Sequence, residues 1–269
     1  MFAIIEVVLR FVYNPPRHKN DPQLSLTYHS ELGFKLPEHF DGYSLEAKVK
    51  LNANGFRTID VHQSSKDKTR IVAIGDSFLF GQGVNLHDTF AHKLNSKNIE
   101  YINLAVPGYD TQQEYRCLEI YGWNYLPQEV HLHFFVNDLY FNATPMTFQH
   151  LTGKTKSDNN ALFKHSTSLT LLGKSFISYQ DPHNVMKRAL RFSDPSDSEL
   201  VDWQSLWNKN FEVLESIKSS CDKHAVSLKV IIHPIPYQSS SRGERYQSVL
   251  TPMLLKSGID YLDLRPFIK

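Results

Sequence analysis

Short apolar runs alternate along the chain with segments in which apolar residues recur at every third or fourth position. The runs are rich in β-branched and aromatic residues, and several are nearly continuous in apolar ones, which favours strands buried on both faces of a sheet. They are residues 70–75, 101–106, 129–136, 227–232 and 260–264. Helical spacing lies between them, in a segment that starts after a cap at Asp88, in residues 112–125 and in residues 203–221.

This alternation predicts an α/β fold: a three-layer α/β/α sandwich around a five-stranded parallel sheet with right-handed crossovers. Ligands of such sheets bind beyond the carboxyl ends of the strands. The turns that follow Gly75, Val106 and Val136 are therefore the places where chemistry is expected.

Two long segments lie outside the alternation. Residues 1–69 are rich in Pro, Asn, Tyr and His, and we expect them to form an extension packed on a domain of residues 70–269. Residues 142–202 form an insertion between the third and fourth strands, with a helix candidate around Leu169, Leu172 and Phe176. Such an insertion serves either as a lid over a site or as extra structure, and the sequence leaves both open.

Composition and charge exclude one class of partner and one class of fold. The 269 residues are 41% hydrophobic, enough for a sizeable core. Lys and Arg number 29 against 28 Asp and Glu, so the chain lacks the positive charge that binds a phosphate backbone, and we expect no nucleic-acid partner. Two cysteines, Cys117 and Cys221, form at most one bridge, which excludes a disulfide scaffold.

Residues 1–13 are mostly apolar but shorter than a membrane span, which needs roughly 20 residues. Glu6 and Arg10 interrupt the run, and the basic start and small-residue cleavage site of a secretory signal are missing. Two interpretations remain: a helix docked on the protein, or the remnant of a membrane anchor.

The turn after the first sheet strand reads Gly75-Asp76-Ser77-Phe78. It lacks the Lys-Ser/Thr of a P-loop and the third glycine of a dinucleotide fingerprint, and Leu79 stands where a Gly-x-Ser-x-Gly elbow needs glycine. A serine at this place starts a helix, whose first amides and dipole favour developing negative charge. The alternative is that Ser77 only caps that helix.

The next two strands end in Asn103-Leu-Ala-Val-Pro-Gly108 and in Asn137-Asp138. Gly108 lets its backbone approach a ligand closely, and Asn137 presents a side-chain amide. Together with the Ser77 hydroxyl, these residues compose a nucleophile with three oxyanion donors: the N–H groups of Ser77 and Gly108 and the NH₂ of Asn137.

These three motifs resemble the SGNH (GDSL-type) hydrolase superfamily, and residues 51–60 resemble a segment of a bacterial, membrane-tethered branch associated with glycan acylation. The resemblance implies a carboxylic-ester hydrolase (EC 3.1.1 type) without a cofactor or metal, in which Ser77 is the nucleophile and Ser77, Gly108 and Asn137 form the oxyanion hole. It also implies an O-acetyl or other O-acyl ester of a glycan or lipid as substrate, and a membrane-associated or extracytoplasmic location in a bacterium.

The superfamily's fourth motif, Asp-x-x-His, supplies the general base, and this sequence does not contain it. The chain stops at residues 264–269, where the last strand should end, so three explanations stay open: the natural chain continues, another histidine substitutes, or the protein is a weak catalyst. His233 follows the fourth strand and His183 lies beside Asp181 in the insertion, so both are candidate bases, although surface roles suit both as well.

His131 and His133 are two residues apart on the third strand and therefore share one face. No third ligand accompanies them, so we expect packed, hydrogen-bonded histidines in place of a metal pair. Two other functions compete with esterase activity: a module that binds an acylated glycan or lipid, and a partner of a membrane acyltransferase. The sequence does not indicate an oligomeric state.

Overall fold

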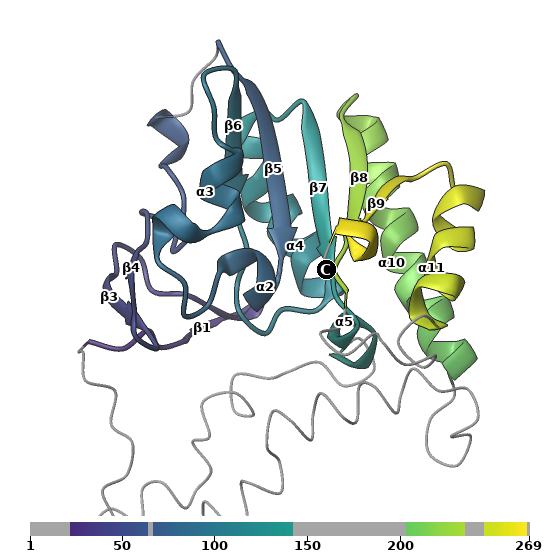
Figure 1. The fold of residues 1–269 in the computed structure, drawn as a ribbon, viewed down its shortest axis with the longest axis horizontal. Helices are drawn as coiled ribbons and strands as arrows, with labels where there is room; N and C mark the ends of the chain where they lie inside the picture. The colour runs from purple at the N-terminus through teal and green to yellow at the C-terminus, as the bar shows by residue number, and fades with distance from the viewer. Residues whose placement is uncertain (1–21, 64–66, 142–202, 235–244, 268–269) are drawn as a thin grey trace, which may run out of the picture.

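The computed structural model describes residues 22–63, 67–141, 203–234 and 245–267. Its centre is a five-stranded parallel sheet of order β6-β5-β7-β8-β9 (Figure 1). The strands are β5 (Thr69–Gly75), β6 (Ile99–Asn103), β7 (Glu129–Phe134), β8 (Ser227–Ile232) and β9 (Asp260–Asp263). The predicted fold class is confirmed.

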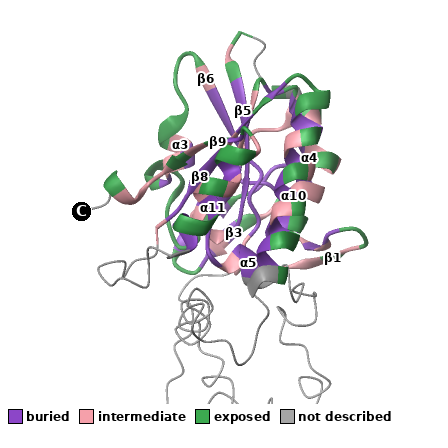
Figure 2. Ribbon diagram, turned by 90° about the vertical axis from the view of Figure 1, so that its right-hand side faces the viewer, coloured by how far each residue is buried: buried purple, intermediate pink, exposed green. Residues whose placement is uncertain are grey.

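Helices cover both faces of this sheet (Figures 1 and 2). On one face lie α4 (Thr111–Tyr121) and α10 (Trp203–Lys223), and on the other lie α2 (Ser77–Phe80) and α3 (Phe90–Leu94). The strands are buried between these layers, and every residue of β5 after Thr69 is buried. This explains why the central strands are almost continuous in apolar residues.

The remaining elements are short or lie at the edges. Helix α11 (Arg245–Lys256) packs beside β9. It was not predicted, because Pro252 interrupts a segment whose buried residues Tyr246, Leu250 and Leu254 nevertheless have helical spacing. The others are α5 (Asn137–Phe141), η1 (Val61–Gln63), η2 (Leu86–Asp88), η3 (Gly122–Tyr125) and η4 (Arg265–Phe267).

The start of α3 corrects one prediction. The N-cap is Thr89, whose side chain accepts the N–H of His92, whereas Asp88 belongs to η2. Both residue types are common caps, so composition alone did not separate them. Helix α4 begins with a capping box in which Asp110 and Gln113 bond each other's backbone N–H groups.

Three strands end earlier than predicted, β6 at Asn103, β7 at Phe134 and β9 at Asp263, and side chains bond the backbone just after the first two. After β6, the Asn103 carboxamide accepts the Ala105 N–H at 2.9 Å and donates to the carbonyl of Leu79 at 3.0 Å. After β7, the Asp138 carboxylate accepts the Phe135 N–H at 2.9 Å. Both side chains thus turn the chain at the carboxyl edge of the sheet.

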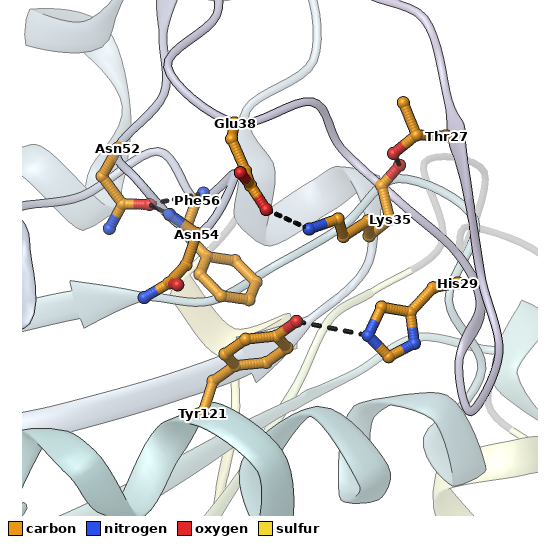
Figure 3. Close-up of polar contacts among 8 residues, drawn as sticks. All are labelled: Thr27, His29, Lys35, Glu38, Asn52, Asn54, Phe56 and Tyr121. Atoms are coloured by element: carbon orange, nitrogen blue, oxygen red, sulfur yellow. Dashed lines mark hydrogen bonds and ion pairs between the residues drawn. The ribbon is translucent and has the colours of Figure 1, made fainter.

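Residues 22–50 contain two antiparallel hairpins that pack on the core. They are β1 (Thr27–His29) with β2 (Gly33–Lys35), and β3 (Asp41–Ser44) with β4 (Ala47–Lys50). Phe34 is fully buried, and its carbonyl accepts the Tyr109 hydroxyl at 2.8 Å. Figure 3 shows the Tyr121 hydroxyl beside Nε2 of His29, at 3.3 Å, which joins the first hairpin to α4.

Several predicted features lie outside the described residues: the apolar segment 1–13 and the insertion 142–202 with its helix candidate. Within the part of the chain that the structure describes, no helix is long and apolar enough to span a membrane. Cys117 and Cys221 are both buried free thiols.

Candidate active site

The candidate site lies at the carboxyl edge of the sheet, beside α2 and α5 at the lower end of the strands in Figure 1. The strand order places β5 between β6 and β7, so the loops that follow these three strands meet at this edge. Ser77 follows β5, Gly108 follows β6 and Asn137 follows β7. The three predicted residues therefore come from three neighbouring strands.

Ser77 is the first residue of α2, and it is not the cap of that helix. The N-cap is Asp76, whose carboxylate accepts the Phe78 N–H at 2.8 Å. The Ser77 hydroxyl is left outside the capping interaction, and its Oγ lies 3.5 Å from Oδ2 of Asp76, at the outer limit of a hydrogen bond. The interpretation of Ser77 as a helix cap is therefore wrong.

Asp76 also orients Asn137. The side-chain Nδ2 of Asn137 donates to Oδ2 of Asp76 at 2.9 Å, which turns the NH₂ group towards the loop after β5. A carboxamide nitrogen has two hydrogens, so one remains for a ligand. Ser77 and Asn137 are thus brought together through a shared carboxylate.

Gly108 occupies the turn after β6 with a φ of 88°, a left-handed conformation that favours glycine. The Tyr109 N–H closes this turn on the Val106 carbonyl at 3.1 Å, and the Val106 N–H bonds the Gly75 carbonyl at 3.1 Å. The second loop is therefore tied to the end of β5, the strand that leads to Ser77.

The Asp76 carboxylate is contacted by two groups from the first turn of α2. The Phe78 N–H donates to it at 2.8 Å, and the Ser77 hydroxyl lies 3.5 Å from it. Burial raises the pKa of Asp76, and these bonds together with the Asn137 amide act in the opposite direction. The three expected donors for a developing oxyanion, the N–H groups of Ser77 and Gly108 and the second hydrogen of Asn137, stay a prediction.

Four carboxyl groups gather beneath the site, and we call them the acid cluster: Asp76, Asp110, Glu114 and Asp138. Burial raises the pKa of Glu114 and Asp138 well above their usual range, and their carboxylate neighbours act in the same direction. Among the described residues, both carboxyl oxygens of Glu114 and Oδ1 of Asp138 have no hydrogen-bond partner. Such concentrations of raised pKa are common at functional sites.

Of the two candidate bases, the structure describes only His233. His183 lies outside the described residues. His233 lies directly after β8, two strands from β5, with its ring centroid 5.8 Å from that of Phe78. No hydrogen bond within the described part of the chain joins His233 to Ser77, so its role as base stays a prediction.

His131 and His133 lie on the face of β7 covered by α2 and α3, and both are hydrogen-bonded to the Tyr101 hydroxyl, at 3.1 and 2.7 Å. The Phe90 ring of α3 stacks on His133 with centroids 5.2 Å apart. Within residues 22–63, 67–141, 203–234 and 245–267, no group of three His, Cys, Asp or Glu side chains is arranged to hold a metal ion.

Sequence reasoning missed the role of Asp76, which caps α2 and orients Asn137, although the residue belongs to the first motif. It also missed Glu114, one turn into α4. The spacing from Asp110 to Glu114 places both carboxyl groups at the start of one helix, but only the packing of α4 on β5 brings them to Asp76.

No protein-family model matches the chain, and the comparison with curated proteins finds no match. Solved structures with a similar backbone include AlinE4, described as an SGNH-hydrolase family esterase, with 12% identity, 74% of this chain and 77% of that chain covered, and a TM-score of 0.41. A GDSL-like lipase from Bacteroides thetaiotaomicron has 11% identity, coverage of 77% and 74%, and a TM-score of 0.43.

The esterase EstA from Pseudoalteromonas sp. has 12% identity, coverage of 73% and 77%, and a TM-score of 0.41. All three carry names of ester-hydrolysing enzymes. At these scores the likenesses assign neither residues nor a substrate to this chain, whose fold is established by its own strand order.

Proposed function

We propose that this chain is a serine esterase that acts on carboxylic esters through Ser77. The observation that carries the proposal is the double use of Asp76: its carboxylate caps α2 and at the same time holds the Asn137 amide. A serine hydroxyl and an amide donor are thereby fixed at one edge of the sheet, as acyl transfer requires.

In the proposed reaction, Oγ of Ser77 attacks the ester carbonyl carbon and loses its proton to a general base. The N–H groups of Ser77 and Gly108 and the free hydrogen of Asn137 stabilise the negative oxygen of the tetrahedral intermediate. The alcohol leaves with a proton, and water then hydrolyses the acyl-enzyme and regenerates Ser77.

The substrate class is a finer proposal: an O-acetyl or other O-acyl group of a glycan or lipid. It is supported by residues 51–60, which resemble a segment of glycan-acylation proteins. The structure places this segment against the core, where Asn52 donates to the Ile59 carbonyl at 2.9 Å and Phe56 is buried.

The test is hydrolysis of p-nitrophenyl acetate by the wild type and by Ser77→Ala, with the exposed Ser219→Ala on α10 as the matched control. We expect Ser77→Ala to lose at least about 10³-fold in kcat, since the nucleophile is removed, and Ser219→Ala to keep the wild-type rate. Equal rates in all three proteins would contradict the proposal.

A binding module is the second candidate, and one observation favours it: among the described residues, the hydrogen-bond partner of the Ser77 hydroxyl is a carboxylate and not a histidine. It predicts affinity for an acylated glycan or lipid without turnover. Saturable binding of an O-acetylated oligosaccharide together with equal, background hydrolysis by all three proteins would establish it in place of the esterase.

A further inference from the structure

A continuous row of hydrogen-bonded side chains crosses the sheet on the face covered by α2 and α3, and we call it the histidine chain. Oε2 of Glu129 lies 3.1 Å from Nε2 of His131, whose Nδ1 lies 3.1 Å from the Tyr101 hydroxyl. The same hydroxyl lies 2.7 Å from Nε2 of His133. Nδ1 of His133 then lies 2.8 Å from Nε2 of His233.

The histidine chain connects opposite ends of the sheet. Glu129 begins β7 opposite Ser227, and His233 follows the last residue of β8, so the row covers six residues or about 20 Å along the strands. Tyr101, His133 and His233 are buried, whereas the Glu129 side chain is 38% exposed. One end of the chain, Glu129, is therefore exposed to solvent, and the other, His233, is buried at the carboxyl edge of the sheet.

Small residues of β5 make the row continuous. Tyr101 is on β6, and β5 separates it from the two histidines on β7. On the shared face, β5 presents Ala73 opposite His131 and Gly75 opposite His133. A Cβ on Gly75 would lie 3.0 Å from Cβ of His133, so a larger side chain would crowd that residue.

Burial favours the neutral form of each imidazole in this row. Burial lowers the pKa of His133 well below its usual range and lowers that of His233 to about 4. Burial also lowers the pKa of His131, with Glu129 acting in the opposite direction. A neutral imidazole carries one N–H and one lone pair.

The donor and the acceptor of each hydrogen bond in the histidine chain then follow from its Glu129 end. A carboxylate only accepts, so Nε2 of His131 donates to Glu129, and Nδ1 of His131 accepts the hydroxyl of Tyr101. The Tyr101 oxygen therefore accepts the Nε2–H of His133. Nδ1 of His133 accepts the Nε2–H of His233, which leaves the lone pair of His233 on Nδ1.

We propose that the histidine chain is a proton store for the carboxyl edge of the sheet, with Nδ1 of His233 as the atom that takes up the proton and Glu129 as the place where it comes to rest. The proposal rests on the esterase function proposed above. In that reaction a proton leaves the Ser77 hydroxyl on attack, and the departing alkoxide needs one.

The transfer is balanced at every step. Nδ1 of His233 gains a proton, each following group passes its own proton to the next, and the Glu129 carboxylate becomes a carboxylic acid. The reverse shift returns the proton to the alkoxide, so no net charge remains after turnover. Since the ends of β5 and β8 are two strands, about 10 Å, apart, water in the site carries the proton between Ser77 and His233.

Nitrogen NMR of the histidine rings at neutral pH tests the direction of the hydrogen bonds in the histidine chain, and it needs no substrate. We expect both His133 and His233 as Nε2–H tautomers in the wild type. Glu129→Lys replaces an acceptor by a donor, and should shift both rings to the Nδ1–H form. Glu129→Gln, which has the same shape and both roles, should populate both forms.

A second substitution shows whether the effect travels through the chain. In Tyr101→Phe/Glu129→Lys the hydroxyl link is missing, so His133 and His233 should no longer respond to residue 129. Tyr121→Phe/Glu129→Lys is the matched control, because the Tyr121 hydroxyl contacts only His29 among the imidazoles of the described residues (Figure 3). A wild-type Nδ1–H tautomer at His233, or an unchanged response in the Tyr101→Phe background, would overturn the proposal.

Ester hydrolysis then tests whether the histidine chain stores the proton that the reaction releases. Tyr101→Phe should lose activity that added imidazole buffer restores, because a soluble base replaces the interrupted chain, while the wild type and Tyr121→Phe should not respond to the buffer. A Tyr101→Phe defect that buffer does not relieve would overturn the storage role. If Ser77→Ala and the wild type hydrolyse equally, the esterase fails, and the tautomer experiment still decides the direction of the chain.

Discussion

Two groups of mostly buried ionisable side chains lie on the sheet, the histidine chain along the strands and the acid cluster at their carboxyl edge, and they are built in opposite ways. In the histidine chain, both ring nitrogens of His131 and of His133 have a partner. In the acid cluster, the Glu114 carboxyl has no partner among the described residues, and neighbouring carboxylates raise its pKa further. The first group is satisfied by its neighbours, and the second is not.

The difference shows where the fold tolerates an unfavourable contribution to its free energy of folding. A buried network with all partners present stabilises a core, whereas an unpartnered buried carboxyl group is unfavourable. The unfavourable group lies beneath Ser77 and Asn137, around the carboxylate that orients the site. Structures retain such groups mainly at functional sites, so the acid cluster supports the placement of the site at this edge.

Among substitutions that touch these two groups or their direct partners, the largest effect is expected at Asn137, which bonds Asp76 of the acid cluster. Asn137→Ala removes an oxyanion donor and the partner of Asp76, and should lower kcat for p-nitrophenyl acetate by about 10²- to 10³-fold. Asn124→Ala, an exposed asparagine after α4, is the control and should retain the wild-type rate. Equal effects of the two substitutions would remove Asn137 from the site.

A substitution in the histidine chain, whose side chains have hydrogen-bond partners, should mainly change the free energy of unfolding. His133→Phe keeps an aromatic ring but removes the donor to the Tyr101 oxygen and strands the His233 N–H, and should lower the free energy of unfolding by about 2–3 kcal/mol in urea titrations. The exposed His87→Phe is the control.

The pH dependence of this loss has a definite sign. Because the pKa of His133 is lowered in the fold, its neutral form contributes stability above the unfolded value of 6.5, and that contribution is lost as pH falls towards the folded value. The difference between wild type and His133→Phe should therefore shrink on acidification. A difference independent of pH would contradict neutral burial of this ring.

The smallest effect is expected in the acid cluster, with the opposite pH dependence. The pKa of Glu114 is raised in the fold, so its contribution is fully present below the unfolded value of 4.5 and is lost as pH rises towards the folded value. Glu114→Gln removes this loss and should stabilise the protein by about 1 kcal/mol at neutral pH, and more as pH increases. Urea titrations across pH, with the exposed Glu215→Gln as control, measure it; a destabilised Glu114→Gln would show that the carboxyl group has a partner.

The sequence predicted the sheet well because its strands are buried on both faces and are marked by apolar runs; residues 227–232 match β8 to the residue. It placed Ser77, Gly108 and Asn137 at one edge for the same reason. It could not predict that Asp76 caps α2, because Ser77 is an equally good capping residue. It predicted that His131 and His133 share a face, but not their partners, since Tyr101 reaches them only across the small residues of β5.

The account depends most on Ser77 as a nucleophile. Treatment of the full chain with a fluorophosphonate, followed by mass spectrometry of its peptides, measures this directly, because such reagents phosphonylate activated serines. The account predicts a single adduct on Ser77, retained in Ser219→Ala and absent from Ser77→Ala. No adduct on the wild type, or an adduct that persists in Ser77→Ala, would contradict it.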